Sequence, residues 1–355
     1  MLEFNNNVIL YNSTKAEEIL LEYTCKTKII NMEAKMTMKV LITPRSFGKT
    51  SNIPFEMLKK YDYEIIRNET GKPYEEDELK ELIKDVDGVI VGLDKITEDV
   101  LKNAKKLKVI TKYGVGLDNI DINYAEKLGI KVTYTPGANK ESVADLAFTM
   151  MLGLSRDIIK LDKIVRNNQW NKIIGCEIYG KTIGIIGTGS IGKCVAKRAT
   201  GFDMEILAYD KYPDYDFADK IGMKYVDKKT LLEKSDFITL HVPLTDEMYH
   251  FIDEEELNMM KDTAYIINTS RGGIINENAL YSALKSKKIA GAALDAFETE
   301  PPLNNKLLEL DNIILSPHCG ASTKDATDRM GIMAVEGLIS VLEGMEPKYL
   351  YKKIN

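Results

Sequence analysis

The sequence predicts an α/β protein with two Rossmann-like, doubly wound, parallel-sheet domains. Its 355 residues suit two domains of ordinary size. Short apolar runs alternate with amphipathic stretches, which is the pattern of βαβ units. This alternation occurs before and again after a long helical stretch, so we expect each series to form a sheet of its own.

The first series follows an N-terminal extension, residues 1–37, in which we find no chemistry. A short strand at 8–11 and a capped helix after Thr14 are expected there. Beyond the extension, the pattern predicts strands at 39–44, 63–67, 88–91 and 108–111 and helices at 54–60, 75–84 and 98–105.

A single long helix is predicted over 139–170, which contains no proline. Its apolar residues lie close to all-round, and a helix of that kind is usually buried. They include Phe148, Met150, Met151, Leu152 and Leu154. We therefore expect a homodimer in which residues 139–170 of two copies cover each other.

The second series opens with a strand and a glycine-rich turn. Gly187, Gly189 and Gly192 form a G-x-G-x-x-G pattern between strand 182–186 and a helix. Such glycines let the backbone turn tightly and approach a pyrophosphate, while the first amides of the helix face the anion. Ser190 and Ile191 would supply these amides. The pattern predicts a Rossmann-like, dinucleotide-binding domain, with further strands at 205–209, 237–240, 264–268, 290–294 and 312–315.

Asp210 ends the next strand, where a carboxylate would accept hydrogen bonds from a ribose diol. Its negative charge would repel the 2′-phosphate of NADP, which favours NAD as the cofactor. Lys211 follows directly and offsets part of that charge.

Three later strands end in reactive side chains. Arg271 follows strand 264–268, Glu298 and Glu300 follow strand 290–294, and His318 follows strand 312–315. Ligands of an open α/β sheet bind beyond the carboxyl ends of its strands, so we expect an arginine, a carboxylate and a histidine to meet there. His241, at the end of strand 237–240, is a rival for the histidine, and either glutamate could be the carboxylate.

The composition narrows the partners. The chain has 48 Lys+Arg and 54 Asp+Glu, a formal net charge of −6. This acidic balance, without a basic run, disfavours nucleic acid and an anionic membrane. The four cysteines form no C-x-x-C pair, and no metal site is predicted. With no signal segment at the N-terminus, we expect a cytoplasmic protein.

Five ordered motifs within residues 38–355 resemble the D-isomer-specific 2-hydroxyacid dehydrogenases. They are Gly-Thr-Gly-Ser-Ile-Gly at 187–192, His-Val-Pro-Leu-Thr at 241–245, Asn-Thr-Ser-Arg-Gly-Gly at 268–273, Leu-Asp-Ala-Phe at 294–297 with Glu-Pro-Pro at 300–302, and Pro-His-Cys-Gly at 317–320. The resemblance implies NAD-dependent interconversion of a D-2-hydroxy acid and its 2-oxo acid. It also implies a substrate domain, 38–138 completed by 321–355, and an NAD-binding Rossmann domain, 139–320, with a cleft between them.

The same resemblance implies roles for single residues. His318 would act as acid and base, Glu300 would orient it, and Arg271 would clamp the substrate carboxylate. Backbone amides of the loop 113–120, those of Val115 and Gly116 among them, would hold that carboxylate as well. Besides the glycine-rich turn and Asp210, the cofactor would contact His241, Pro243, Thr269, Ser270, Arg271, Asp295, His318, Gly320 and Ala321.

Within the family, the chain resembles most the D-3-phosphoglycerate dehydrogenases, in a short form that stops soon after Lys348. The expected substrates are therefore 3-phosphoglycerate and 3-phosphohydroxypyruvate, in serine biosynthesis, with Lys112 and Arg45 facing the phosphate. Gly92 stands where some of these enzymes have arginine. The alternative is a hydroxypyruvate, glyoxylate or general 2-oxo acid reductase. A remote one is an NAD-sensing, corepressor-like binding protein.

Overall fold

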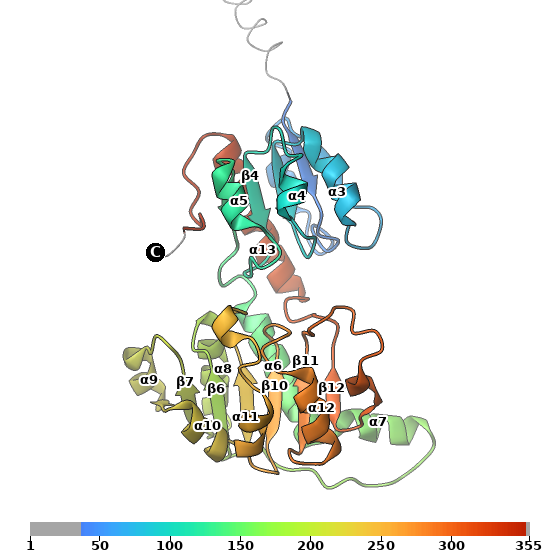
Figure 1. Cartoon of the computed structure of the whole chain (residues 1–355), viewed down its shortest axis with the longest axis vertical. Helices are drawn as coiled ribbons and strands as arrows, with labels where there is room; N and C mark the ends of the chain where they lie inside the picture. The colour runs from blue at the N-terminus through green and yellow to red at the C-terminus, as the bar shows by residue number, and fades with distance from the viewer. Residues whose placement is uncertain (1–36, 353–355) are drawn as a thin grey trace, which may run out of the picture.

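The computed structural model describes residues 37–352, which form two lobes, each built around one parallel sheet (Figure 1). The predicted two-sheet α/β architecture is confirmed. The strand and the helix expected within residues 1–36 lie outside the described residues. The domain boundaries at 138/139 and 320/321 stay a prediction.

The sheet of the first lobe has five strands in the order β2-β1-β3-β4-β5. They are β1 (Lys39–Ile42), β2 (Glu64–Arg67), β3 (Gly88–Val91), β4 (Val109–Lys112) and β5 (Lys131–Thr133). Helices α3 (Glu76–Leu82), α4 (Glu98–Leu101) and α5 (Ile122–Lys127), with the 3-10 turn η1 (Ile83–Asp85), pack on one face. Helices α2 (Ile53–Leu58) and α13 (Lys324–Leu342) pack on the other.

Helix α13 belongs to the core of this first lobe although about 190 residues separate it from β5 in the chain. Ala334, Val335 and Leu338 of α13 are fully buried in one cluster with Val40 and Val109 of the sheet. Burial of such side chains stabilises each by about 1.5–3 kcal/mol relative to exposure, alanine less. The first sheet is therefore completed by a late segment of the sequence.

The sheet of the second lobe has seven parallel strands in the order β12-β11-β10-β9-β6-β7-β8, a doubly wound arrangement that reverses beside β6. Its strands are β6 (Thr182–Ile186), β7 (Glu205–Tyr209), β8 (Lys224–Tyr225), β9 (Phe237–Leu240), β10 (Tyr265–Asn268), β11 (Gly291–Leu294) and β12 (Ile313–Leu315). Helices α6 (Lys140–Ser155), α8 (Ser190–Thr200) and α9 (Tyr215–Ile221) pack on one face. Helices α10 (Lys228–Lys234), α11 (Glu254–Met259) and α12 (Glu277–Lys285) pack on the other, with short turns at η2 (Asp246–Met248) and η3 (Lys306–Glu309).

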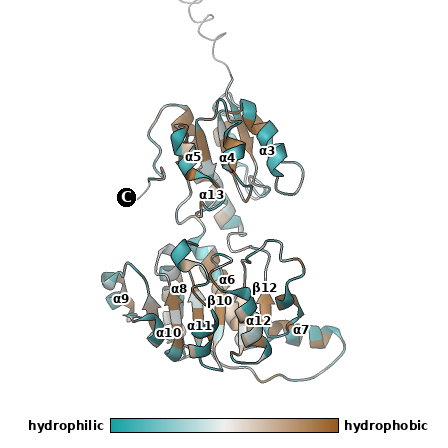
Figure 2. Ribbon diagram, in the orientation of Figure 1, coloured by the Kyte–Doolittle hydropathy of each residue, from teal (hydrophilic) through white to brown (hydrophobic). Residues whose placement is uncertain are grey.

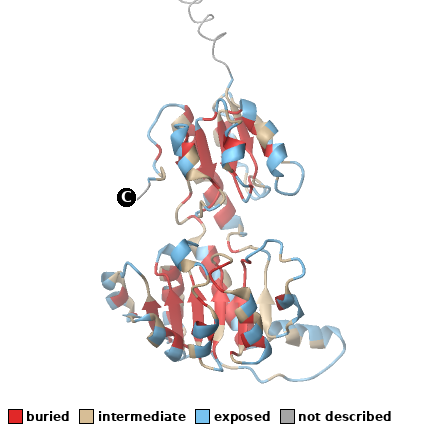
Figure 3. Cartoon of the chain, in the orientation of Figure 1, coloured by how far each residue is buried: buried red, intermediate tan, exposed pale blue. Residues whose placement is uncertain are grey.

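Strands β5 and β8 are missing from the predicted set because each is short and begins with an exposed lysine. Neither therefore forms an apolar run, whereas the equally short β12 is wholly apolar. The longer strands stand out as apolar, buried segments in both lobes (Figures 2 and 3). Among residues 37–352, no helix combines the length and apolar character needed to cross a bilayer.

The prediction of one helix over 139–170 is wrong. The segment forms α6 and then α7 (Ile158–Arg166), because Asp157 adopts a left-handed conformation with φ of 49° and ends the first helix. The apolar residues of α6 other than Leu146, which is partly buried, and Leu152, which is exposed, are buried within the chain itself, mainly against α8 and the sheet. The all-round apolar character of this segment therefore needs no second copy to explain it.

Candidate active site

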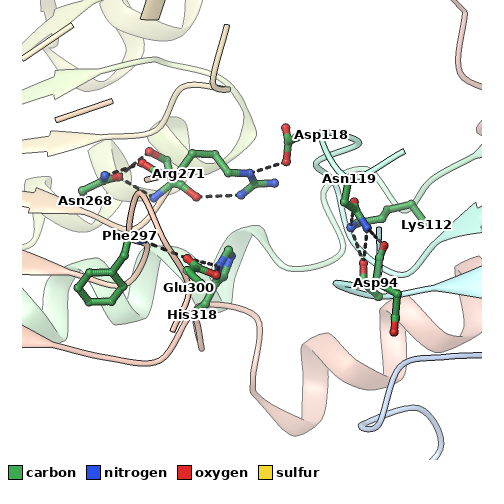
Figure 4. A network of polar contacts seen from close by, with 11 residues as sticks. Asp94, Lys112, Asp118, Asn119, Asn268, Arg271, Phe297, Glu300 and His318 are labelled. Atoms are coloured by element: carbon green, nitrogen blue, oxygen red, sulfur yellow. Dashed lines mark hydrogen bonds and ion pairs between the residues drawn. The ribbon is translucent and has the colours of Figure 1, made fainter. Parts of the chain in front are cut away.

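His318 and Glu300 form an ion pair at the carboxyl end of the second sheet. Nδ1 of His318 lies 2.9 Å from each carboxylate oxygen of Glu300, and both side chains are about one-third exposed (Figure 4). Burial raises the pKa of Glu300, but hydrogen bonds from His318 and from the amide of Phe297 outweigh it and lower that pKa below its usual value. Glu300 is thus held as a carboxylate, and Nε2 of His318 is left for a ligand.

Asp295, fully buried at the end of β11, fixes the loop that carries His318. One carboxylate oxygen accepts hydrogen bonds from Ser316 Oγ (2.5 Å) and the amide of Cys319 (2.8 Å), and the other accepts from the amide of Gly320 (2.8 Å). His318 itself has a positive φ of 49°, which is unusual for a residue with a side chain. The contacts of Asp295 therefore set where the imidazole stands.

Arg271 follows β10 and reaches across to the first lobe. Its Nε donates to Asp118 Oδ2 at 2.7 Å, and its Nη1 donates to the carbonyl oxygen of Ser270 at 2.8 Å (Figure 4). The side chain of Asn268 holds the turn. Its Nδ2 donates to the backbone carbonyl of Arg271, and its Oδ1 accepts from the backbone amide and the hydroxyl of Ser270. The guanidinium is thereby supported from both lobes.

The loop 113–120 presents free backbone donors beside this guanidinium. The amide of Gly114 donates to Thr135 Oγ1, whereas the amides of Val115 and Gly116 make no hydrogen bond to any described residue. A Cβ atom at Gly116 would lie 1.6 Å from Nη2 of Arg271. Only glycine lets the loop and the guanidinium approach so closely, and together they can hold a carboxylate.

Lys112 lies beneath this loop, and its ammonium is engaged by the protein. Nζ donates to the carbonyl of Gly92 (2.6 Å) and to Oδ1 of Asn119 (2.5 Å), and the residue is only 6% exposed. Burial, aided by the charge of Arg271, lowers the pKa of Lys112 to about 8. Its location below the loop differs from the exposed position expected of a phosphate ligand.

The remaining phosphate candidate, Arg45, also has an internal partner. Its Nη1 donates to the carbonyl of Gly71 at 2.7 Å, on an exposed loop. At Gly92, a Cβ atom would lie 3.3 Å from the ring of Pro44, so this position offers little room for a larger residue.

The glycine-rich turn has the shape that a dinucleotide needs. A Cβ atom at Gly192 would lie 2.0 Å from the carbonyl oxygen of Gly187, which has a φ of 92°. A Cβ atom at Gly189 would meet nothing within 4 Å. Gly189 is the N-cap residue of α8, and it has no side chain to bind the first amides of the helix. The amides of Ser190 and Ile191 therefore open onto that free space. The turn fits a pyrophosphate.

Asp210 stands next to the turn. Its Oδ2 accepts from the amide (2.6 Å) and hydroxyl (3.0 Å) of Thr188, and its Oδ1 accepts from the amide of Tyr212 (2.8 Å). Oδ1, which accepts only this one hydrogen bond from the described residues, keeps acceptor capacity for a ribose hydroxyl. Lys211 is paired with Glu247, with Nζ 3.0 Å from Oε2, so its charge has a partner.

His241 turns its imidazole toward its own strand. Nε2 lies 2.9 Å from Thr239 Oγ1, and burial lowers the pKa of His241 to about 3. Nδ1 of His241 and the hydroxyl of Thr269 are buried without a hydrogen-bond partner in the described structure. A cofactor rich in polar atoms fits these two unpartnered groups. Pro243 and Ser270 lie in the adjacent loops, and Ala321 packs against the core of the first lobe.

The two rival side chains named by the sequence lie elsewhere. Glu298 binds His250, with Oε1 of the carboxylate 3.0 Å from Nε2 of the imidazole, and it also accepts from the amide of Glu277. Nε2 of His241 bonds Thr239 and its Nδ1 has no hydrogen-bond partner in the described structure, whereas Nδ1 of His318 is held by Glu300. Among the described residues, no group of three or more His, Cys, Asp or Glu side chains could hold a metal ion.

Two residues of the site escaped sequence reasoning. Asp118 holds Arg271, and Asn119 bonds Lys112 and the carbonyls of Gly92 and Asp94. Both lie within the loop 113–120, for which only backbone contacts to the substrate carboxylate were predicted. Arg271 is 153 residues from Asp118, and the contacts of Asn119 follow no regular spacing, so no sequence pattern could reveal them.

Comparison with known proteins identifies the family of the chain. Residues 148–320 match the family model of the D-isomer specific 2-hydroxyacid dehydrogenase NAD binding domain. A glyoxylate reductase of Thermococcus litoralis is 44% identical over 317 residues, covering 86% of this chain and 96% of that protein. A D-3-phosphoglycerate dehydrogenase of Methanocaldococcus jannaschii is 46% identical over 272 residues, 76% of this chain but only 52% of that protein.

A solved structure gives the same result. The D-lactate dehydrogenase of Aquifex aeolicus, complexed with NAD and lactic acid, superposes with a TM-score of 0.76 at 34% identity, covering 86% of this chain and 96% of that one. The chain therefore belongs to the D-isomer-specific 2-hydroxyacid dehydrogenases, as an NAD-dependent oxidoreductase that interconverts 2-hydroxy and 2-oxo acids.

Proposed function

We propose that the protein reduces a small, unphosphorylated 2-oxo acid, glyoxylate or hydroxypyruvate, with NADH. The observation that carries this choice is the state of Lys112, whose ammonium is buried and bound to Gly92 and Asn119. A phosphate needs cations that are free to approach it. The likeness to a glyoxylate reductase over 96% of that protein supports the same choice. The phosphoglycerate prediction is thus replaced by its alternative.

The charges near the cleft support this proposal. Asp118 pairs with Arg271, and the buried Asp94 lies close enough to Lys112 to affect its electrostatics. These two carboxylates offset the two cations. With the charges of Arg271 and Lys112 offset in this way, the site suits the single negative charge of a small 2-oxo acid better than the additional charges of a phosphate.

We assign the chemical roles as follows. Arg271 and the amides of Val115 and Gly116 hold the substrate carboxylate, which fixes the 2-oxo group near His318. NADH, when bound, supplies the hydride. His318 donates a proton from Nε2 to the 2-oxygen, while its Nδ1 stays on Glu300, whose carboxylate stabilises the protonated imidazole. In the reverse direction His318 accepts the proton.

The test is a substrate panel at one NADH concentration. We expect higher kcat/KM for glyoxylate or hydroxypyruvate than for 3-phosphohydroxypyruvate, by at least tenfold. A preference for 3-phosphohydroxypyruvate would reject the proposal and restore the phosphoglycerate assignment. Absence of turnover with every 2-oxo acid would instead favour a binding protein.

We also propose a homodimer, on grounds that differ from the sequence argument. Helix α7 has no buried residue, and Ile158, Val165, Trp170 and Ile174 are 55–98% exposed. So many large apolar side chains in one segment suit a second copy of the chain. In sedimentation velocity at micromolar concentration we expect a dimer, converted to monomer by Trp170→Asp but not by Leu128→Asp, a change at an exposed apolar residue of the other lobe.

The three cysteines of the described part of the chain are free, which fits our placement of the protein in the reducing cytoplasm.

A further inference from the structure

We propose that Asp118 is a positioning residue for catalysis, which orients Arg271 for the substrate carboxylate across the gap between the lobes. This inference rests on the proposed reduction of a 2-oxo acid, but on no particular side chain of that acid. The observation behind it is the ion pair between Asp118 Oδ2 and Arg271 Nε, 2.7 Å long, which joins residues 153 positions apart in the chain.

The loop that carries Asp118 is firmly held. The next residue, Asn119, binds the ammonium of Lys112 and the carbonyls of Gly92 and Asp94. Ile120 then forms a bridge with Ile96, and Asp121 caps α5 through the amide of Tyr124. Asp118 is therefore a carboxylate on a fixed support and not a mobile surface group.

The hydrogen bonds of Arg271 favour an orienting role. A guanidinium has five N–H protons. Asp118 takes the one on Nε, and the carbonyl of Ser270 takes one on Nη1. Both protons of Nη2 remain, and Nη2 faces Gly116, beside the free amides of the loop. The protein thus binds Nε and Nη1 of the guanidinium and leaves Nη2 available for the substrate carboxylate.

The position of the pair also links the two lobes. Asp118 lies on the first lobe, and Arg271 lies on the second, directly after β10. A hollow of about 460 Å³ beside Asp118 is lined by residues of both lobes, including Leu117 and Leu244. Because Arg271 is anchored to the loop whose amides hold the same carboxylate, the two halves of the carboxylate site are kept in register.

The test uses Asp118→Asn, which keeps the shape and removes the charge. We expect its KM for glyoxylate to rise about 10- to 100-fold, the usual cost of losing a residue that orients a ligand-binding group. Affinity for NADH, from fluorescence titration, and the melting temperature should stay nearly unchanged. Asp121→Asn, on the same loop but away from Arg271, is the matched control and should keep the KM within twofold.

A double variant separates positioning from a general effect on the loop. In an Arg271→Gln background, Asp118→Asn should lower kcat/KM by less than about twofold, because there is no guanidinium left to orient. Equal losses in both backgrounds, an unchanged or lowered KM in Asp118→Asn, or an equal rise in Asp121→Asn would overturn the inference. If the unmodified protein prefers another 2-oxo acid, the same variants are measured with that acid, since all 2-oxo acids share the carboxylate.

Discussion

The imidazole Nδ1 of His318 is equidistant from the two carboxylate oxygens of Glu300, at 2.9 Å from each. This pairing leaves a single nitrogen, Nε2, to exchange a proton with substrate. The charges of the site are also separated: the carboxylate of Glu300 lies on the Nδ1 side of the imidazole, and the guanidinium of Arg271 lies beside Gly116, where the substrate carboxylate would bind.

Replacing His318 by alanine should lower kcat for 2-oxo acid reduction by about 10²–10⁴-fold, because a positioned acid is lost. Binding of NADH, measured by fluorescence titration, should be nearly intact. His241→Ala is the comparison, and it should cost less, since that imidazole is turned toward Thr239. The assignment of roles is wrong if the two losses are reversed.

Replacing Glu300 by glutamine should lower kcat for 2-oxo acid reduction, because Nδ1 of His318 loses the carboxylate that orients the imidazole. Stability gives a second readout. Because the folded pKa of Glu300 is lowered, its carboxylate stabilises the fold above the unfolded value of about 4.3, and this gain is lost as pH falls through the folded pKa. The melting temperature of wild type should therefore exceed that of the variant at neutral pH and converge with it in acid.

Asp210 should make NAD the preferred cofactor. We expect a higher kcat/KM with NADH than with NADPH, and Asp210→Ala should narrow the ratio, because the charge that repels a 2′-phosphate is removed. Glu247→Gln should narrow the NADH/NADPH ratio less. It releases Lys211, whose positive charge could then face a 2′-phosphate, from an exposed and therefore weak ion pair. Equal use of both cofactors by the unmodified protein would contradict this prediction.

Gly116→Ala should lower kcat/KM by about 10²-fold, because its Cβ would displace Arg271 from beside the loop. Gly201→Ala is the control: Gly201 has an ordinary helical conformation, and a Cβ there would lie 3.4 Å from its nearest neighbour. The measurement is kcat/KM of the two variants in steady-state kinetics. Similar kcat/KM for both would argue against a tight fit at Gly116.

Lys112→Met should reveal the cost of burying an ammonium. The pKa of Lys112 is about 8 in the folded protein and about 10.4 in unfolded chains, so between these values the unfolded state binds more protons. The stability contributed through Lys112 therefore rises with pH in this window. The melting temperature of wild type relative to Lys112→Met should increase from pH 7.5 to 9.5. A constant difference would mean that Lys112 titrates normally.

The sequence predicted most strands of both sheets because each is a short apolar run between helices. It could not predict the break at Asp157, since no proline or glycine marks that residue. Residues at strand ends, such as Arg271 and His318, were accessible because topology gathers those ends together. Contacts between lobes, such as the one made by Asp118, depend on how two domains meet, and Lys112 shows that residue type alone does not tell whether a cation is free.

Helix α13 has a consequence for biosynthesis. One face of the first sheet is covered by this helix and α2, yet α13 is translated only after the whole of the second sheet. On the ribosome, Val40 and Val109 must wait with part of their surface uncovered while β6 to β12 emerge and fold. The lobe that begins first is thus completed last, after the whole of the second sheet has been translated.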